Sequence, residues 1–331
     1  MQNEHIWHKL PKPFFVLAPM EDVTDSVFRQ IIADCGKPDI FFTEFTNSQG
    51  LMRAEKAVAH RLQFTEKERP LIAQIWGVTP ENHFQAAQKI RDLGFDGIDI
   101  NMGCPVKKIV KKGACSALIK NKSLAQEIIA ATKEGASPLP VSVKTRIGFD
   151  CVDTENWVSF LLNQKIDALT IHGRTAKQMS KVPNNWNEIG KAVHLRNQLG
   201  VSTIIVGNGD IQSLADGHEK VNEYGLDGIM IGRGIFNNPW LFNPHKDAQK
   251  ITTQERIDLF IKHVQLFSRT WGEDKNLGIL KKFVKTYVKE FPGSAQLRDQ
   301  IMQIESYAEL LMVLESFKPA DTHSDNAQSE A

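Results

Sequence analysis

The sequence predicts an α/β fold, a (β/α)8 TIM barrel followed by a small all-helical C-terminal domain. Between residue 13 and about residue 240, eight short runs rich in Val, Ile and Phe alternate with longer amphipathic stretches, as repeated βα units with a parallel sheet do. Polar residues stand at the C-terminal end of nearly every run, where the loops of a barrel meet at one mouth. Beyond about residue 250, apolar residues follow helical spacing and no further strand-like run occurs.

The eight runs are the expected barrel strands. In chain order they read PFFVLAP, DIFFTEF, LIAQIWG, GIDINMG, VSVKTR, ALTIHGR, TIIVGNGD and GIMIGRG. Between them we expect helices such as 80–93, which opens at Thr79-Pro80 with Glu81 in its first turn, and 123–135, opened by Ser123 and closed by Gly135. An open doubly wound sheet shares this local pattern, but no GxGxxG fingerprint follows the first run.

The C-terminal region shows two amphipathic patterns. The first helical pattern is formed by Ile257, Phe260, Ile261, Val264 and Phe267. The second, over 279–291, has an apolar face of Leu280, Phe283, Val284, Tyr287, Val288 and Phe291. Lys281, Lys285 and Lys289 recur at i, i+4 and i+8 and predict a cationic stripe on its other face. We expect a barrel domain over 1–247, a helical domain over 248–318, and a disordered, polar tail over 319–331.

Composition excludes several classes of protein. Among 331 residues, 40 Lys and Arg face 39 Asp and Glu, so a polyanionic partner must be bound by local basic patches. The four cysteines form no CxxC pair and are too few for a disulfide scaffold, which favours reduced thiols in a cytoplasm. No apolar stretch reaches the ~18 residues of a membrane span. We expect a cytoplasmic protein without a membrane segment.

The strand ends predict one pocket. In chain order they supply Pro19, Met20, Glu44, Gln74, Asn101, Cys104, Lys144, Arg146, His172, Arg174, Asn208, Gly232 and Arg233. The seventh and eighth runs end in GNGD and GRG, where glycines let backbone N–H groups approach an anion, and many barrels hold a phosphate there. Lys144 would place a cation at the same mouth, which suits the negative charge that builds up on a reduced flavin ring.

Six ordered motifs, APMEDVTD, NMGCP, VKTRIG, IHGRT, GNGDI and IGRG, resemble those of the tRNA-dihydrouridine synthase family, from about residue 14 to 318. The resemblance implies a flavoenzyme that holds FMN at the barrel mouth, uses NADPH, with NADH as the alternative, and reduces uridines in tRNA. It implies flavin contacts at Pro19, Met20, Gln74, Lys144, His172, Asn208, Gly209, Asp210, Gly232 and Arg233.

The cysteine of the NxGCP motif, Cys104, matches the family's proton donor. Reduction of a uracil C5=C6 bond needs hydride at C6 and a proton at C5 from the opposite side of the base, so a positioned acid is required. A thiol with pKa ~8.5 is mostly protonated at neutral pH. Asn101 is expected to hydrogen-bond the base, and Arg146 and Arg174 to lie on the substrate side. Cys115, in a segment where the family often has a small residue, is a modest departure.

A basic loop follows the motif. From Asn101 to Gln126 there are six lysines and no acidic residue. Lys107, Lys108, Lys111 and Lys112 are therefore expected to bind the tRNA backbone, together with the stripe on 279–291. The target uridine must leave its stack to enter the mouth. We expect a monomer without a metal ion.

The sequence is compatible with two alternatives. An FMN barrel oxidoreductase acting on a small-molecule pyrimidine would not need a basic helical domain. A non-catalytic RNA-binding module would be expected to have lost the flavin or thiol residues, and none is missing here.

Overall fold

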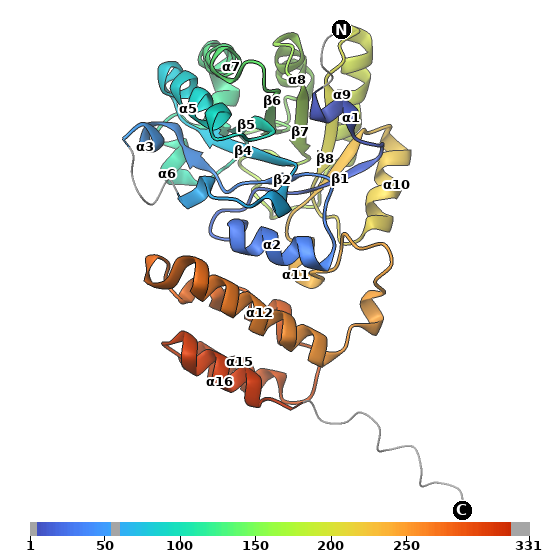
Figure 1. Cartoon of the computed structure of the whole chain (residues 1–331). Helices are drawn as coiled ribbons and strands as arrows, with labels where there is room; N and C mark the ends of the chain where they lie inside the picture. The colour runs from blue at the N-terminus through green and yellow to red at the C-terminus, as the bar shows by residue number, and fades with distance from the viewer. Residues whose placement is uncertain (1–4, 54–59, 319–331) are drawn as a thin grey trace, which may run out of the picture.

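Parallel strands form one continuous sheet that curls into a barrel in the computed structural model, which describes residues 5–53 and 60–318 (Figure 1). The nine strands of this described part are β1 (Phe14–Leu17), β2 (Phe41–Phe42), β3 (Thr46–Asn47), β4 (Leu71–Trp76), β5 (Gly97–Met102), β6 (Val141–Arg146), β7 (Ala168–His172), β8 (Ile204–Asn208) and β9 (Gly228–Ile231). Their order is β1-β9-β8-β7-β6-β5-β4-β2, and β3 also pairs with β4. A parallel bridge between Val16 and Ile40 joins β1 to the segment before β2. The predicted barrel is confirmed.

The second predicted run is divided into two short strands. β2 pairs with the start of β4 and β3 with its end. Between them, the Thr43 hydroxyl accepts a hydrogen bond from the backbone N of Gln74 over 3.0 Å, so a side chain takes the place of a strand partner. Together β2 and β3 fill one of the eight positions around the barrel.

Helices cover the outside of the barrel (Figure 1). Those of the barrel part are α1 (Ile6–Lys9), α2 (Ser26–Cys35), α3 (Ser48–Met52), α5 (Pro80–Asp92), α6 (Lys107–Val110), α7 (Lys122–Ala136), α8 (Thr154–Asn163), α9 (Trp186–Leu199), α10 (Leu214–Tyr224) and α11 (Gly234–Asn237). The predicted helix over 80–93 is confirmed as α5. The helix expected over 123–135 begins one residue earlier, because the Asn121 side chain, and not Ser123, caps it by accepting from Leu124 N over 3.2 Å.

The barrel interior has an apolar floor and a polar upper layer. Val16, Ile72, Ala168 and Val206 belong to one buried apolar cluster, which Trp7 of α1 joins. Side chains alternate along a strand, so the residues two positions further on occupy the next layer. In β4 and β8 these are Gln74 and Asn208, and in β6 Lys144 follows the buried Ser142 by two residues; all three lie toward the C-terminal ends of their strands. The alternation therefore gathers the polar side chains at the mouth.

The C-terminal helices pack below the barrel (Figure 1). They are α12 (Thr253–Trp271), α13 (Gly278–Lys281), α14 (Val284–Tyr287), α15 (Ser294–Gln303) and α16 (Tyr307–Ser316), and α12 packs against both α2 and α16. No helix in the described part of the chain is long and apolar enough to cross a membrane. The tail predicted over 319–331 lies outside the described residues.

The single helix expected over 279–291 is wrong. The chain forms two short helices there, α13 and α14, and leaves helical structure after Tyr287. Hydrogen bonds from residue i to i−3 occur between the two helices and at their ends, such as Phe283 N to Leu280 O and Thr286 N to Phe283 O. β-branched and aromatic residues such as Val284, Tyr287 and Val288 have low helix propensity. The stabilisation gained by burying the apolar side chains in the core is therefore larger than that of one continuous, regular helix.

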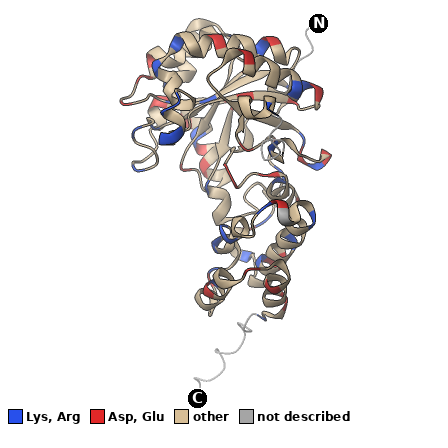
Figure 2. Cartoon of the chain, turned by 90° about the vertical axis from the view of Figure 1, so that its left-hand side faces the viewer, with Lys and Arg blue, Asp and Glu red and all other residues tan. Residues whose placement is uncertain are grey.

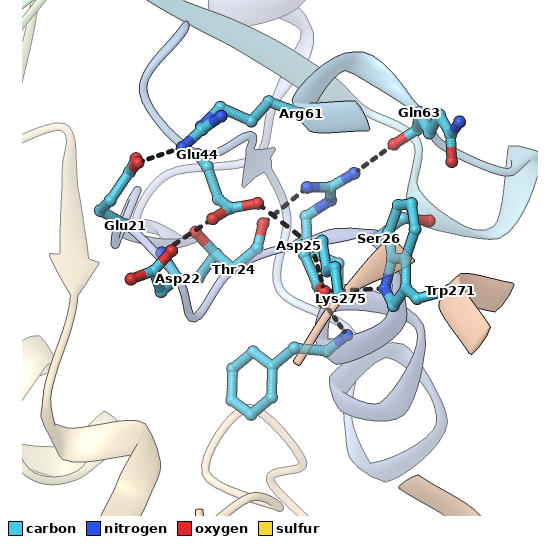
Figure 3. A network of polar contacts seen from close by, with 12 residues as sticks. Glu21, Asp22, Thr24, Asp25, Ser26, Glu44, Arg61, Gln63, Trp271 and Lys275 are labelled. Atoms are coloured by element: carbon cyan, nitrogen blue, oxygen red, sulfur yellow. Dashed lines mark hydrogen bonds and ion pairs between the residues drawn. The ribbon is translucent and has the colours of Figure 1, made fainter. Parts of the chain in front are cut away.

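A buried polar anchor joins the C-terminal helices to the barrel (Figure 3). Asp25, which caps α2 by accepting from Phe28 N, is 5% exposed. Its Oδ2 accepts from Trp271 Nε1 over 2.9 Å and from Lys275 Nζ over 2.8 Å. Lys275 Nζ also lies 3.9 Å from a carboxylate oxygen of Glu44, at the end of the second run. The anchor thus connects the loop after β1 to the residues that follow α12.

Candidate active site

A buried hydrogen-bond chain leads from the barrel interior to Cys104. The Ser142 hydroxyl and the Gln74 side-chain amide both donate to Asp99, over 2.6 and 2.7 Å. Asn101 Nδ2 donates to Gln74 Oε1 over 3.0 Å. Asn101 Oδ1 then accepts from the backbone N of Gly103 and of Cys104, each over 3.0 Å. The side chain of Asn101 therefore fixes the turn at Gly103 and Cys104, which is called the cysteine turn below.

Asp99 and Ser142 were not predicted as site residues from the sequence. Asp99 could have been noticed because it is the one charged residue of its strand, two positions before Asn101. Residues two positions apart on a barrel strand face the same side, so Asp99 faces the same side as Asn101. Burial raises the pKa of Asp99 to about 6, although the hydrogen bonds from Ser142 and Gln74 oppose this shift. Each side chain in this series of hydrogen bonds is held by the next one, which makes the polar layer of the barrel interior rigid.

Cys104 lies next to a second cysteine. The side chain of Cys115 forms a hydrogen bond to Cys104, which is the main cause that lowers the pKa of the Cys104 thiol to about 7. Burial opposes the shift, while the backbone at Val106 and the positive charges of Arg146 and Lys144 add to it. Cys104 is partly exposed and Cys115 is buried. The site therefore holds one accessible, acidified thiol.

Lys144, His172 and Asn208 meet on three adjacent strands. Lys144 Nζ donates to Asn208 Oδ1 over 3.0 Å, and Asn208 Nδ2 donates to Met230 O over 2.8 Å. His172 is the sheet partner of Asn208. Burial lowers the pKa of Lys144 to about 8, and repulsion from Arg146 contributes. Burial and several neighbouring cations depress the pKa of His172 far below its ordinary value, so this imidazole is neutral.

The loops at Gly209 and Gly232, which follow β8 and β9, are called the glycine loops, and a cavity of about 480 Å³ lies beside them. Its lining includes Gly209, Asp210, Gly232 and Arg233, and the sulfur of Met20 lies near Gly232. Gly209 has φ of +129°, and a Cβ atom there would approach the Asn184 side chain to 2.2 Å, so a larger residue would block this corner. Pro19 directly precedes Met20 at the end of the first run. The structure brings these predicted cofactor residues to one corner of the mouth.

Asn184 is a further site residue that sequence analysis missed. Both polar atoms of its side chain are buried without a hydrogen-bond partner, while its backbone N donates to Asp210 over 3.1 Å. Buried polar groups are normally satisfied, so an orphaned amide against Gly209 fits a polar ligand. No motif signals it, because it lies far along the loop after β7, away from the strand end.

The two arginines predicted to face substrate are engaged in loop contacts. Arg146 donates to the backbone carbonyls of Gly103, Thr175 and Met179 over 2.7, 3.1 and 2.9 Å. Arg174 donates to Val182 O over 2.5 Å and pairs with Asp210. These contacts tie the loop after β7 to the cysteine turn and to the glycine loop. Asp210 also faces Arg233 at 3.5 Å.

The basic loop is exposed beside the mouth. Lys107, Lys108, Lys111 and Lys112 are all exposed, on and just after α6. Figure 2 shows basic residues on both the barrel and the C-terminal helices. The proposed stripe on the C-terminal helices is less uniform, because Lys281 Nζ donates to Met302 O over 2.7 Å and Lys289 Nζ to Asn237 O over 2.8 Å. Two of its three lysines thus contact backbone carbonyls of their own chain.

The chain is similar to known proteins over most of its length. The family model described as "Dihydrouridine synthase (Dus)" matches residues 16–322. A protein of Staphylococcus aureus (strain COL) named "Probable tRNA-dihydrouridine synthase" is 43% identical over 320 residues, which cover 96% of each chain. Bacillus subtilis (strain 168) has a "Probable tRNA-dihydrouridine synthase 2" that is 43% identical over 320 residues, 96% of this chain and 97% of that one.

Among solved structures, a mutant of morphinone reductase in complex with tetrahydroNAD matches 72% of this chain and 89% of its own, with 13% sequence identity and a TM-score of 0.49. The family match spans the barrel, the cysteine turn, the glycine loops and the C-terminal helices, and two relatives share 43% identity over nearly the whole chain. The chain therefore belongs to the dihydrouridine synthase family.

Proposed function

We propose that this chain is a cytoplasmic tRNA-dihydrouridine synthase that acts as a monomer, binds FMN at the barrel mouth and takes its electrons from NADPH. The observation that carries the proposal is the position of Cys104, on a turn fixed by Asn101 and next to the cation Lys144. The family match supports the substrate class, since the relatives are named for uridine modification in tRNA.

The residues at the mouth fit FMN. The cavity beside Gly209 and Gly232, with Arg233 at its edge, suits the phosphate, and the orphaned amide of Asn184 fits a polar partner there. Four cations, Lys144, Arg146, Arg174 and Arg233, act together on His172, and this excess of positive charge favours an anionic ligand. Lys144 would face the ring. FMN, when bound, supplies the hydride for C6 of the uracil.

Cys104 donates the proton at C5. Its pKa of about 7 keeps a large thiol fraction at neutral pH and brings the acid close to the ambient pH, where general acids work best. Asn101 acts on this step by holding the turn, because both ends of its amide are already engaged. Arg146, through Gly103 O, holds the turn from the other side. The base is thereby met by an acid in a fixed position.

The tRNA backbone is held by the basic loop. Lys107, Lys108, Lys111 and Lys112 lie directly after the cysteine turn, so a strand of RNA crossing them passes over the mouth. The target uridine is flipped out of its stack to reach Cys104. The C-terminal helices, with Lys285 exposed on α14, complete the contact.

The test uses purified, FMN-loaded protein with NADPH and an unmodified tRNA transcript. NADPH oxidation should depend on tRNA, and dihydrouridine should form in the RNA. Uridine monophosphate should be at least about 10³-fold poorer as a substrate by kcat/KM, because it lacks the phosphate contacts. Equal turnover of the monophosphate would favour the small-molecule alternative, and absence of flavin from the folded protein would contradict the proposal.

A further inference from the structure

Two thiols that are distant in sequence meet at the end of β5. The 3-10 helix over Cys115–Lys120 returns to the cysteine turn, and Ser116 N donates to Cys104 O over 3.3 Å. Peptide bond geometry then limits the separation of the Cys104 and Cys115 Cα atoms to about 8 Å. The two side chains are close enough to share a hydrogen bond, so their sulfur atoms are neighbours. Disulfides span Cα separations of about 4.4–6.8 Å, so a bond needs only a small movement.

The backbone at Cys115 shows that this thiol is held in place. Cys115 has φ of +54° and is 0% exposed. Residues other than glycine adopt this left-handed region rarely and at a cost, so the surrounding structure must fix the position. Packing around Cys115 leaves its sulfur next to Cys104, while the other two cysteines differ: Cys151 is exposed, and Cys35 is the buried last residue of α2.

The two thiols differ in the way that the partners of a redox pair differ. Cys104 is accessible and has Arg146 and Lys144 nearby, whose charges favour its thiolate. Cys115 is shielded from solvent, and its pKa lies well above the ordinary value because it shares a hydrogen bond with Cys104 and is buried. Oxidants react with accessible thiolates, and a neighbouring thiol then resolves the product.

We propose that Cys104 and Cys115 form a reversible intramolecular disulfide when the enzyme meets a hydroperoxide. In the first step the Cys104 sulfur takes one oxygen from hydrogen peroxide, giving a sulfenic acid and one water. In the second step the Cys115 sulfur attacks the Cys104 sulfur, the S–S bond forms, and the hydroxyl leaves with the Cys115 proton as a second water. Two thiols lose two electrons and two protons, and a dithiol reductant restores them.

The consequence rests on the proposed function of Cys104 as proton donor. The disulfide removes the thiol proton, so reduction of uridine in tRNA should stop while NADPH still reduces the flavin. Formation of the bond itself does not depend on that role. The enzyme would thus cease to modify tRNA under oxidation and resume when reduced, without loss of its cofactor.

The experiment treats FMN-loaded full-length protein with a small excess of hydrogen peroxide, then alkylates free thiols and maps peptides by mass spectrometry. Trypsin cuts at the lysines between the two cysteines, so the disulfide should appear as two peptides joined through Cys104 and Cys115. Turnover of uridine in tRNA should fall by about 10²-fold or more, as for loss of a general acid, and dithiothreitol should restore it.

Two variants make the result decisive. Cys115→Ser should give no joined peptides, and its peroxide-treated Cys104 should pass to sulfinic acid, which dithiothreitol does not reverse. Cys151→Ser, at the exposed cysteine, should behave like the wild type. Flavin absorbance reports that each variant is folded. Absence of the 104–115 linkage in the oxidised wild type would overturn the proposal. If the linkage formed and uridine reduction continued, the proton-donor role would fail and the disulfide would stand.

Discussion

Removal of the Asp25 carboxylate should destabilise the protein more than removal of any exposed ion pair between the same two parts. Asp25 caps α2 and accepts from Trp271 and Lys275, and all three side chains are largely buried. Loss of an N-cap costs about 1 kcal/mol. A buried indole N–H left without an acceptor costs about 1–3 kcal/mol. Breaking a buried ion pair on one side costs about 3–5 kcal/mol, and these terms overlap.

We therefore expect Asp25→Ala to lower the free energy of unfolding by about 3–5 kcal/mol. Asp25→Asn keeps an oxygen for the cap but loses the charge that faces Lys275, and it should lose about 2 kcal/mol. The measurement is equilibrium urea unfolding followed by tryptophan fluorescence, with the slope compared between variants. The fluorescence of Trp271 should respond directly to loss of the anchor, because its indole N–H donates to Asp25.

The matched control is Lys282→Gln. Lys282 and Asp22 also join the C-terminal helices to the loop after β1, over 3.0 Å, but both side chains are about half exposed. Solvent screens such a pair, so the control should lose only about 0–1 kcal/mol. If Asp25→Ala lost no more than the control, the anchor would contribute nothing beyond surface charge and the reasoning from burial would be refuted.

Four further outcomes are expected. Cys104→Ala should keep FMN and NADPH oxidation but lose about 10²–10⁴-fold in uridine reduction in stopped-flow assays, whereas Cys115→Ala should lose far less; equal mild losses would contradict the assignment. Flavin reduction by NADPH should slow as pH rises through about 8, where Lys144 loses its charge, and Lys144→Ala should bind FMN more weakly and show no such step. Burial raises the pKa of Glu44 from 4.5 to about 7, so its contribution to stability is full below pH 4.5 and is lost as pH rises through 7. Between pH 4.5 and pH 7 the free energy of unfolding of the wild type, measured by urea titration, should fall by about 3 kcal/mol relative to that of Glu44→Gln. If the free energies of the two proteins changed in parallel with pH, the raised pKa of Glu44 would be refuted. The basic loop contains Lys107, Lys108, Lys111 and Lys112. Changing all four to Gln should reduce the slope of the logarithm of tRNA affinity against the logarithm of salt concentration by roughly 3 units, and an unchanged slope would mean that tRNA binds elsewhere.

The barrel and the position of its mouth were predictable because they follow from local periodicity. Each short apolar run and the polar residues at its end are properties of a few neighbouring residues, and the structure places Gln74, Lys144 and Asn208 toward the ends of their strands. The family motifs placed Cys104 at the mouth for the same reason. Each motif is short and lies at one strand end.

Other features depend on contacts that no local pattern encodes. Asp25 and Trp271 are 246 residues apart, and nothing near either one signals the hydrogen bond between them. The apolar residues of 279–291 fit a regular helix and also the i to i−3 bonding that the chain adopts, so spacing alone could not separate the two. Cys115 could be noticed as a thiol near the mouth, but its positive φ and its contact with Cys104 require the fold.

The polar character of the anchor between the barrel and the C-terminal helices has a geometric consequence. The apolar contact between α2 and α12 is driven by the burial of nonpolar surface, which is a non-directional effect. A carboxylate that receives an indole N–H and an ammonium group is satisfied in one alignment alone. Asp25 lies only five positions after Met20, whose sulfur is near Gly232 at the mouth. In the proposed function, where the C-terminal helices contact tRNA, this single carboxylate would set the angle at which the RNA approaches Cys104.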